Sequence, residues 1–182
     1  MLEPRVLDEL DARLRALGAP ICGAWAPGCS DAHIDALLQP LGIDLPEEAR
    51  VWWRWHNGTR SDKPMTHREV FARIPLTIEQ AAEAYEDERD AMHQLFGLTG
   101  LLAPLSEKPL IFFGGAGPAL QPVPIYVQND IDAPAVVLPS IGALVEAWIE
   151  LLESGAWEPG DDGAWHKHPE RVPSGLRLLG IS

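Results

Sequence analysis

Basic residues are scarce in this sequence. Its 182 residues include 14 lysines and arginines against 27 aspartates and glutamates, which gives a formal net charge of −13 at pH 7. A surface of this charge repels phosphate, which argues against direct binding to a nucleic-acid backbone. It attracts a basic protein partner and speeds the encounter with it, although it can also serve solubility alone. Composition therefore leaves two interpretations, an acidic binding surface or an ordinary solvated one.

Cysteines and long apolar runs are scarce as well. Cys22 and Cys29 are the two cysteines, and their spacing without a second pair is not a zinc pattern. No apolar run approaches membrane-spanning length, and the charged first residues lack the apolar stretch of a secretory signal. These absences predict a cytoplasmic protein with reduced thiols and no membrane contact. At this length we expect one domain with its own core.

Motifs for catalysis are missing too. No Gly-x-Ser-x-Gly motif is present. The glycine-rich residues 114–117 are not followed by the Lys-Ser/Thr pair of a phosphate loop, so they are interpreted as a turn between strands. Cys29 precedes a predicted helix, where a thiol pKa can be lowered. We nevertheless predict that the protein is not an enzyme and has no cofactor.

Two groups of residues could hold a metal ion. His166 and His168 lie near an acidic pair at 161–162, but two histidines at this spacing converge only on a strand, and the segment is loop-like. Glu86, Asp90 and His93 share one face of a predicted helix, where a solvated surface is the simpler interpretation. We therefore predict no metal site.

Apolar spacing and turn residues predict the elements of an α+β fold. Helices are expected at 2–17, from Ser30 or Asp31 to about residue 39, at 46–56, at 78–96 behind a Thr77/Gln80 capping box, and after Ser140. Strands are expected at 69–76, 110–113, 124–128 and 135–138. These elements predict an antiparallel or mixed sheet with helices packed on one side.

Residues 41–59 (LGIDLPEEARVWWRWHNGT) hold the densest local pattern. Asp44 is a plausible N-cap and Pro46 suits the first turn of a helix. The residues expected to face the core share spacings of three and four, and they are Leu45, Ala49, Trp52, Trp53 and His56. Trp55 lies on another face, where it either covers a second apolar surface or stands exposed at a contact. Asn57 and Gly58 tolerate a positive φ and suit a helix end or tight turn.

This pattern resembles the SMI1/KNR4 family, also called the SUKH superfamily. The matching residues are Leu41, Gly42, Leu45, Pro46, Trp52, Trp53, Asn57 and Gly58. An Ile74-Pro75-Leu76 element before the long helix and a helix ending near residues 155–157 extend the resemblance over residues 30–157. Residues 101–105 depart from the Trp-x-Pro-hydrophobic strand that is common in the family. We expect an SMI1/KNR4-like domain at 1–157 and a tail at 158–182 that packs on it.

The resemblance implies a sheet with helices around it and a role in protein interaction. It implies a bacterial immunity protein that binds and neutralises a toxin, often a nuclease. A regulatory scaffold, like the fungal regulators of cell-wall synthesis, is the alternative within the same fold. An uncharacterised enzyme with a site in the loops of the sheet is the alternative outside it. The resemblance indicates no active-site residues.

Charge supplies the candidate contact residues. Residues 79–90 contain six carboxylates and one arginine, a local net charge of −5, and acidic pairs follow in two predicted turns. If these lie on one side, they form a surface complementary to a basic toxin; otherwise the helix face is simply solvated. The predicted partner-binding residues are Trp55, Glu86, Asp87, Asp90, Asp130, Asp132, Asp161 and Asp162.

Overall fold

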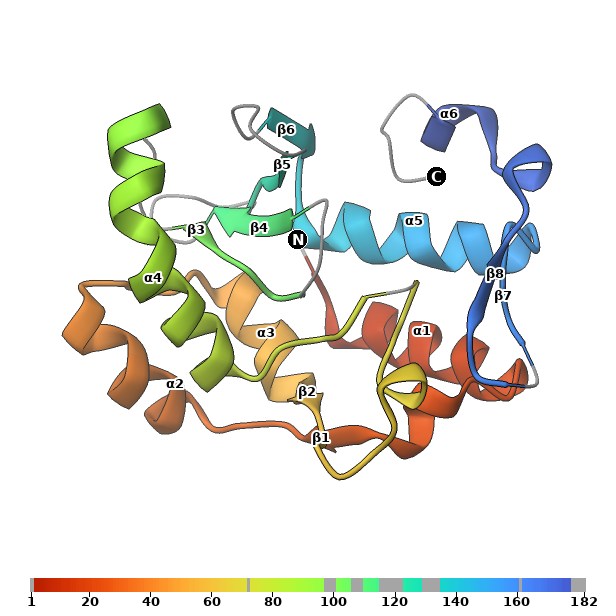
Figure 1. Cartoon of the computed structure of the whole chain (residues 1–182), viewed down its shortest axis with the longest axis horizontal. Helices are drawn as coiled ribbons and strands as arrows, with labels where there is room; N and C mark the ends of the chain where they lie inside the picture. Colours follow the sequence, from red (N-terminus) through yellow and green to blue (C-terminus); the bar gives the residue numbers. More distant parts are fainter. Residues whose placement is uncertain are drawn as a thin grey trace.

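The protein has an α+β fold, as predicted (Figure 1). The computed structural model describes residues 2–71, 73–96, 101–105, 110–114, 123–128, 135–160 and 162–177. The helices in these segments are α1 (Pro4–Ala16), α2 (Asp31–Leu38), α3 (Glu47–Trp55), α4 (Ile78–Phe96), α5 (Ile141–Glu153) and the short α6 (Ser174–Arg177). Single 3-10 turns are η1 (Pro20–Gly23), η2 (Gln39–Leu41), η3 (Met65–His67) and η4 (Pro169–Arg171).

The largest sheet is antiparallel and has the strand order β3-β4-β5-β6. Its strands are β3 (Leu101–Leu102), β4 (Leu110–Gly114), β5 (Ile125–Gln128) and β6 (Ala135–Leu138), and the last three confirm predicted strands. Two small antiparallel pairs join β1 (Trp25–Pro27) to β2 (His56–Thr59) and β7 (Trp157–Pro159) to β8 (Trp165–Lys167). In Figure 1, α1, α2 and α3 lie on one side of the four-stranded sheet.

Three helix starts follow the capping signals of the sequence. The hydroxyls of Ser30 and Ser140 accept first-turn backbone N–H groups of α2 and α5 at 3.3 Å and 3.0 Å. Thr77 and Gln80 form the predicted capping box, with two hydrogen bonds of 3.0 Å and 3.2 Å between each backbone N–H and the other side chain. Because each capping residue lies within three residues of its partner, the sequence alone predicts where these three helices begin.

The start of α3 differs from the prediction. Pro46 occupies the N-cap position and no side chain caps the helix, so the prediction of Asp44 as N-cap is wrong. Asp44 instead lies 3.7 Å from the guanidinium of Arg50, which also donates to the Leu45 carbonyl at 2.8 Å. The predicted apolar face is confirmed for Leu45, Ala49, Trp52 and Trp53, which are all buried, whereas His56 is half-buried and belongs to β2.

Glu48 is fully buried beside this apolar face and holds three chain segments together. One carboxylate oxygen accepts the backbone N–H of Leu2 at 2.7 Å and that of Gly142, in the first turn of α5, at 3.1 Å. The other oxygen accepts the backbone N–H of Val123, just before β5, at 2.7 Å. A buried carboxylate is tolerated when such donors replace its water, and the helix N-terminus favours its charge. We call this arrangement the Glu48 clamp.

The segment 69–76 is not the strand that its apolar residues predict. Its described residues, which exclude residue 72, form isolated bridges, Val70 with Arg73 and Pro75 with Leu105. Phe71 has a φ of 52°, which ends any extended run. Its ring stacks on Trp148 and on Trp165, each at a centroid distance of 5.2 Å. This aromatic packing joins parts of the chain far apart in sequence, so local propensity could not reveal it.

Both ends of the long α4 helix are informative. Apolar spacing predicts an inward face of Ile78, Ala81, Ala82, Tyr85, Met92, Leu95 and Phe96. Ile78, Ala81, Ala82 and Met92 are buried, but Leu95 is 71% exposed, so its predicted inward orientation is wrong. Figure 1 shows the reason, since the last turns of α4 project beyond the body of the molecule.

The C-terminal tail forms β8 and η4 and buries Val172 and Leu176.

Candidate functional site

The predicted acidic contact residues do not form one surface among the residues described. Glu86, Asp87 and Asp90 are exposed on α4, whereas Asp162 is exposed in the hairpin of β7 and β8 and accepts the Ala164 N–H at 3.0 Å. Figure 1 shows α4 and this hairpin at opposite ends of the molecule. Asp130, Asp132 and Asp161 lie outside the described residues. The structure therefore separates the α4 carboxylates from Asp162.

Trp55 uses much of its ring for packing. Its centroid lies 5.1 Å from that of Trp25, 5.8 Å from that of Trp52 and 4.4 Å from that of His56. Burial has the largest influence on the pKa of His56 and lowers it, while a hydrogen bond to the Ala26 carbonyl opposes this shift. This uncharged aromatic cluster fastens β1 and β2 to α3. We therefore do not include Trp55 in the candidate surface.

Glu79, the first acidic residue of α4, already forms hydrogen bonds within the chain. Glu79 lies 2.5 Å from His33 of α2 through one oxygen and accepts from Asn57 at 3.3 Å through the other. Burial alone would raise its pKa, but hydrogen bonds from His33, the backbone, Thr77 and Asn57 outweigh burial and lower the pKa to about 2. Glu79 thus links α2, β2 and α4 rather than offering a free charge.

This lowered pKa makes part of the stability sensitive to acid. The ordinary pKa of 4.5 falls to about 2 on folding, so the contribution of Glu79 is present above pH 4.5 and is lost as the pH falls toward 2. We expect wild-type protein to lose more stability than Glu79→Gln between pH 5 and 2, measured by urea unfolding at each pH. The half-exposed side chain keeps this difference small. Parallel pH profiles for the two proteins would contradict the role of Glu79.

Carboxylates on α2 and α3 are also engaged, in this case by arginines. Arg50 lies 2.6 Å from Asp35 and 3.6 Å from Asp31, and Arg54 contacts both Asp31 and Glu47. Each arginine therefore pairs with more than one acidic group at the junction of the two helices. The carboxylates of Asp31, Asp35 and Glu47 already have a cationic neighbour within this chain.

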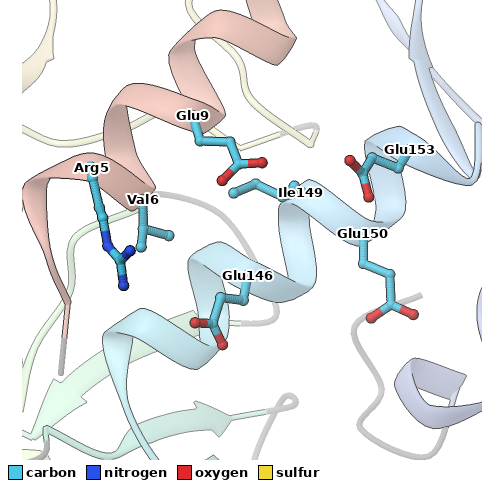
Figure 2. Close-up of a pocket in the computed structure, with 7 residues that line it drawn as sticks. All are labelled: Arg5, Val6, Glu9, Glu146, Ile149, Glu150 and Glu153. Atoms are coloured by element: carbon cyan, nitrogen blue, oxygen red, sulfur yellow. The ribbon is translucent and has the colours of Figure 1, made fainter.

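A groove between α1 and α5 differs from these regions, because carboxylates line an open hollow there (Figure 2). The two helices lie side by side, and the hollow between them has a volume of about 430 Å³. Its lining is mostly charged and consists of Arg5, Val6, Glu9, Glu146, Ile149, Glu150 and Glu153. In Figure 2, Val6 and Ile149 lie at the centre with the charged side chains around them. We call this feature the α1–α5 groove.

Ion pairing covers only one end of the α1–α5 groove. The guanidinium of Arg13 lies 2.5 Å from Glu153 and 3.7 Å from Glu9, so it bridges the two helices. Arg5, at the other end, pairs with Glu3 at 2.6 Å. Among the described residues no cation pairs with Glu146 or Glu150, and both are exposed. These two carboxylates are therefore available to a basic group from outside.

The sequence contains a signal for this groove outside the predicted contact residues. Glu146, Glu150 and Glu153 follow a spacing of four and three residues, so they share one face of α5. The opposite face contains buried apolar residues, which are Ile141, Leu144, Val145, Trp148, Leu151 and Leu152. An acidic stripe on a helix is common, however, and only the packing of α1 beside α5 turns this stripe into the wall of a groove.

The described residues offer no support for the catalytic alternatives. Both thiols are free and half-buried, and burial is the largest cause that raises the pKa of Cys22 and of Cys29. Burial thus opposes the lowered pKa that a position before a helix can give Cys29, and its Sγ donates to the Trp53 carbonyl at 3.4 Å. No group of three or more His, Cys, Asp or Glu side chains in the described part of the chain could hold a metal ion.

The structure describes both histidines of the histidine pattern and only part of the glycine-rich pattern. His166 belongs to β8 and His168 follows it, so the predicted loop there is a strand, and His168 lies 3.6 Å from both Glu158 and Glu170. In the glycine-rich run, only Gly114 is described, as the last residue of β4.

In the described part of the chain, no helix has the length and apolar character to cross a bilayer.

Comparison with known proteins finds neither a family model nor a curated protein that matches the chain. The resemblance to SMI1/KNR4 proteins therefore depends on the residues between 41 and 59 and remains a prediction. The α1–α5 groove combines a hollow, an apolar floor and two carboxylates without a cationic partner among the described residues, and we take it as the candidate site.

Proposed function

We propose that this chain is a cytoplasmic, non-enzymatic interaction protein that binds a basic protein partner through the α1–α5 groove. The supporting observation is that Glu146 and Glu150, beside an apolar floor, are exposed and pair with no cation among the described residues. The net charge of −13 adds a long-range field that attracts a basic partner and raises its association rate. A polar rim around an apolar centre is also the usual anatomy of a protein interface.

We further propose that the partner is a nuclease-type toxin and that this chain is its immunity protein. The resemblance to SMI1/KNR4 proteins supports this proposal. A nuclease surface is basic because it must bind phosphate, so an acidic protein can occupy it in place of the nucleic acid. Such inhibition requires shape and charge complementarity but no catalytic group on the inhibitor.

Co-expression tests the immunity role. We expect a basic nuclease encoded immediately upstream to stop cell growth alone and to be harmless when this chain is co-expressed. Recovery of growth should accompany co-purification of the two proteins. Co-purification without protection would instead favour the regulatory-scaffold alternative. If the upstream gene encodes no such protein, the immunity role loses its basis.

Charge reversal tests which surface binds the partner. We expect Glu146→Lys with Glu150→Lys to weaken binding of the basic partner by at least about 30-fold, roughly 2 kcal/mol, because two attractive contacts become repulsive. Isothermal titration calorimetry at fixed salt measures this change. Both residues are exposed, so the variant should retain the thermal stability of the wild type.

Glu86→Lys with Asp90→Lys is the matched control. It changes net charge equally, uses the same four-residue spacing on an exposed helix, and alters the α4 face predicted from sequence. We expect it to weaken binding less than about fivefold, through the loss of long-range attraction alone. A larger loss for the α4 variant than for the groove variant would move the binding surface to α4 and overturn the role of the groove.

A further inference from the structure

The α1–α5 groove already binds one guanidinium, that of this chain's own Arg13. The group lies between Glu9 on one wall and Glu153 on the other, at 3.7 Å and 2.5 Å. One and two turns back along α5, Glu150 and Glu146 continue the same wall. The wall thus repeats a cation-binding position, and its repeats have no cationic partner among the described residues.

We propose that the groove binds a basic amphipathic α-helix of the partner protein. The lysines or arginines of that helix extend the row begun by Arg13, and its apolar side chains pack on Val6 and Ile149. This inference depends on the proposed function, because it specifies which segment of the basic partner makes the contact. Helices commonly bind grooves through side chains at spacings of three, four and seven residues.

The spacing of the carboxylates favours a helix over an extended peptide. Glu146, Glu150 and Glu153 span about 10 Å along the axis of α5, since a helix rises 1.5 Å per residue. Three cations at the same spacing on a docked helix span the same about 10 Å. Three cations on one face of an extended strand span about 13 Å, so the third falls roughly one ion-pair length out of register.

The floor and volume of the groove limit how the helix binds. Ile149 is buried and Val6 half-buried, and together they form the apolar floor. An apolar side chain of the partner gains binding free energy by covering this floor, whereas a purely polar basic tail does not. Two turns of helix occupy roughly 800 Å³. The hollow holds about 430 Å³, so one face of the helix enters and its backbone stays above the rim. Arg5, which pairs with Glu3, lies at the end opposite Arg13 and offers no carboxylate, so we expect the cations along the Glu146–Glu153 wall.

Two peptide isomers test this inference with the whole protein. The first is an 18-residue alanine-based peptide with lysines at positions i, i+4 and i+7 and leucines on the adjoining stripe. The second has the same composition with the lysines spread around the helix. We expect the first to bind at least about tenfold more tightly in fluorescence anisotropy and to gain helicity by circular dichroism. Glu150→Lys should remove most of this preference, whereas Glu86→Lys should keep it.

The outcomes separate this inference from the proposed function. Equal affinity of the two isomers, or binding of the first without gain of helicity, would overturn the helical occupant. So would the absence of binding by either peptide. None of these results affects the co-expression assay. If this protein protects cells but binds the two peptides equally well, the proposed function stands and the helical occupant of the groove is overturned. Conversely, register-dependent peptide binding without protection would keep the helix site and discard the immunity role.

Discussion

Glu48→Ala should destabilise the protein by about 3–5 kcal/mol, a large share of the 5–15 kcal/mol that holds a typical domain together. The side chain is fully buried, and its removal leaves the backbone N–H groups of Leu2, Val123 and Gly142 without their acceptor. Each buried donor left unsatisfied costs about 1–3 kcal/mol. Urea unfolding followed by tryptophan fluorescence should show a lower midpoint with an unchanged slope.

Two further variants give the Glu48 prediction its controls. Glu47, the neighbour of Glu48, is exposed and pairs with Arg54, so Glu47→Ala should cost less than about 1 kcal/mol. Glu48→Gln keeps the oxygen that serves Leu2 and Gly142 but turns an amide N–H toward that of Val123. We expect about half the loss of the alanine variant. Equal midpoints for Glu47→Ala and Glu48→Ala would show that the clamp contributes no stability.

The Glu48 clamp illustrates what the sequence could and could not predict of the fold. Periodicity and capping signals predicted α1, α2, α4 and α5, because each signal lies within a few residues of the element that it specifies. Glu47 and Glu48 look alike by the same rules, two acidic residues in the first turn of a helix. Only the three donors, 46, 75 and 94 residues away, separate the buried carboxylate from the exposed one.

The candidate site was hidden from the sequence for the same reason. Composition directed attention to acidic surface, and it pointed first to α4 because the carboxylates are densest there. Density along the chain is not density in space, and Glu79 at the base of that helix is already paired with His33. The groove needs α1 beside α5, a contact between segments about 140 residues apart that no local pattern specifies.

Gly58→Ala should destabilise the protein by several kcal/mol, and comparison with Gly42→Ala identifies the cause. Both glycines have a left-handed backbone, with φ of 67° and 72°, a conformation that costs a residue with a Cβ atom about 1–2 kcal/mol. A Cβ atom on Gly42 meets nothing within 4 Å, whereas one on Gly58 lies 2.5 Å from the backbone nitrogen of Thr77. The excess loss at Gly58 therefore measures the close approach of β2 to the start of α4.

This close approach should matter beyond its steric cost. Asn57, beside Gly58, accepts the backbone N–H of Ile78 at 2.7 Å, so β2 caps α4 only when the two backbones lie together. We expect Gly58→Ala to weaken protection from hydrogen exchange in the first turns of α4, with α1 and α5 unchanged, and Gly42→Ala to leave α4 as in the wild type. Equal losses of stability at the two glycines would mean that backbone strain alone acts. Asn57 and Gly58, at the end of the densest pattern in the sequence, would then contribute no stability through the close approach of β2 to α4.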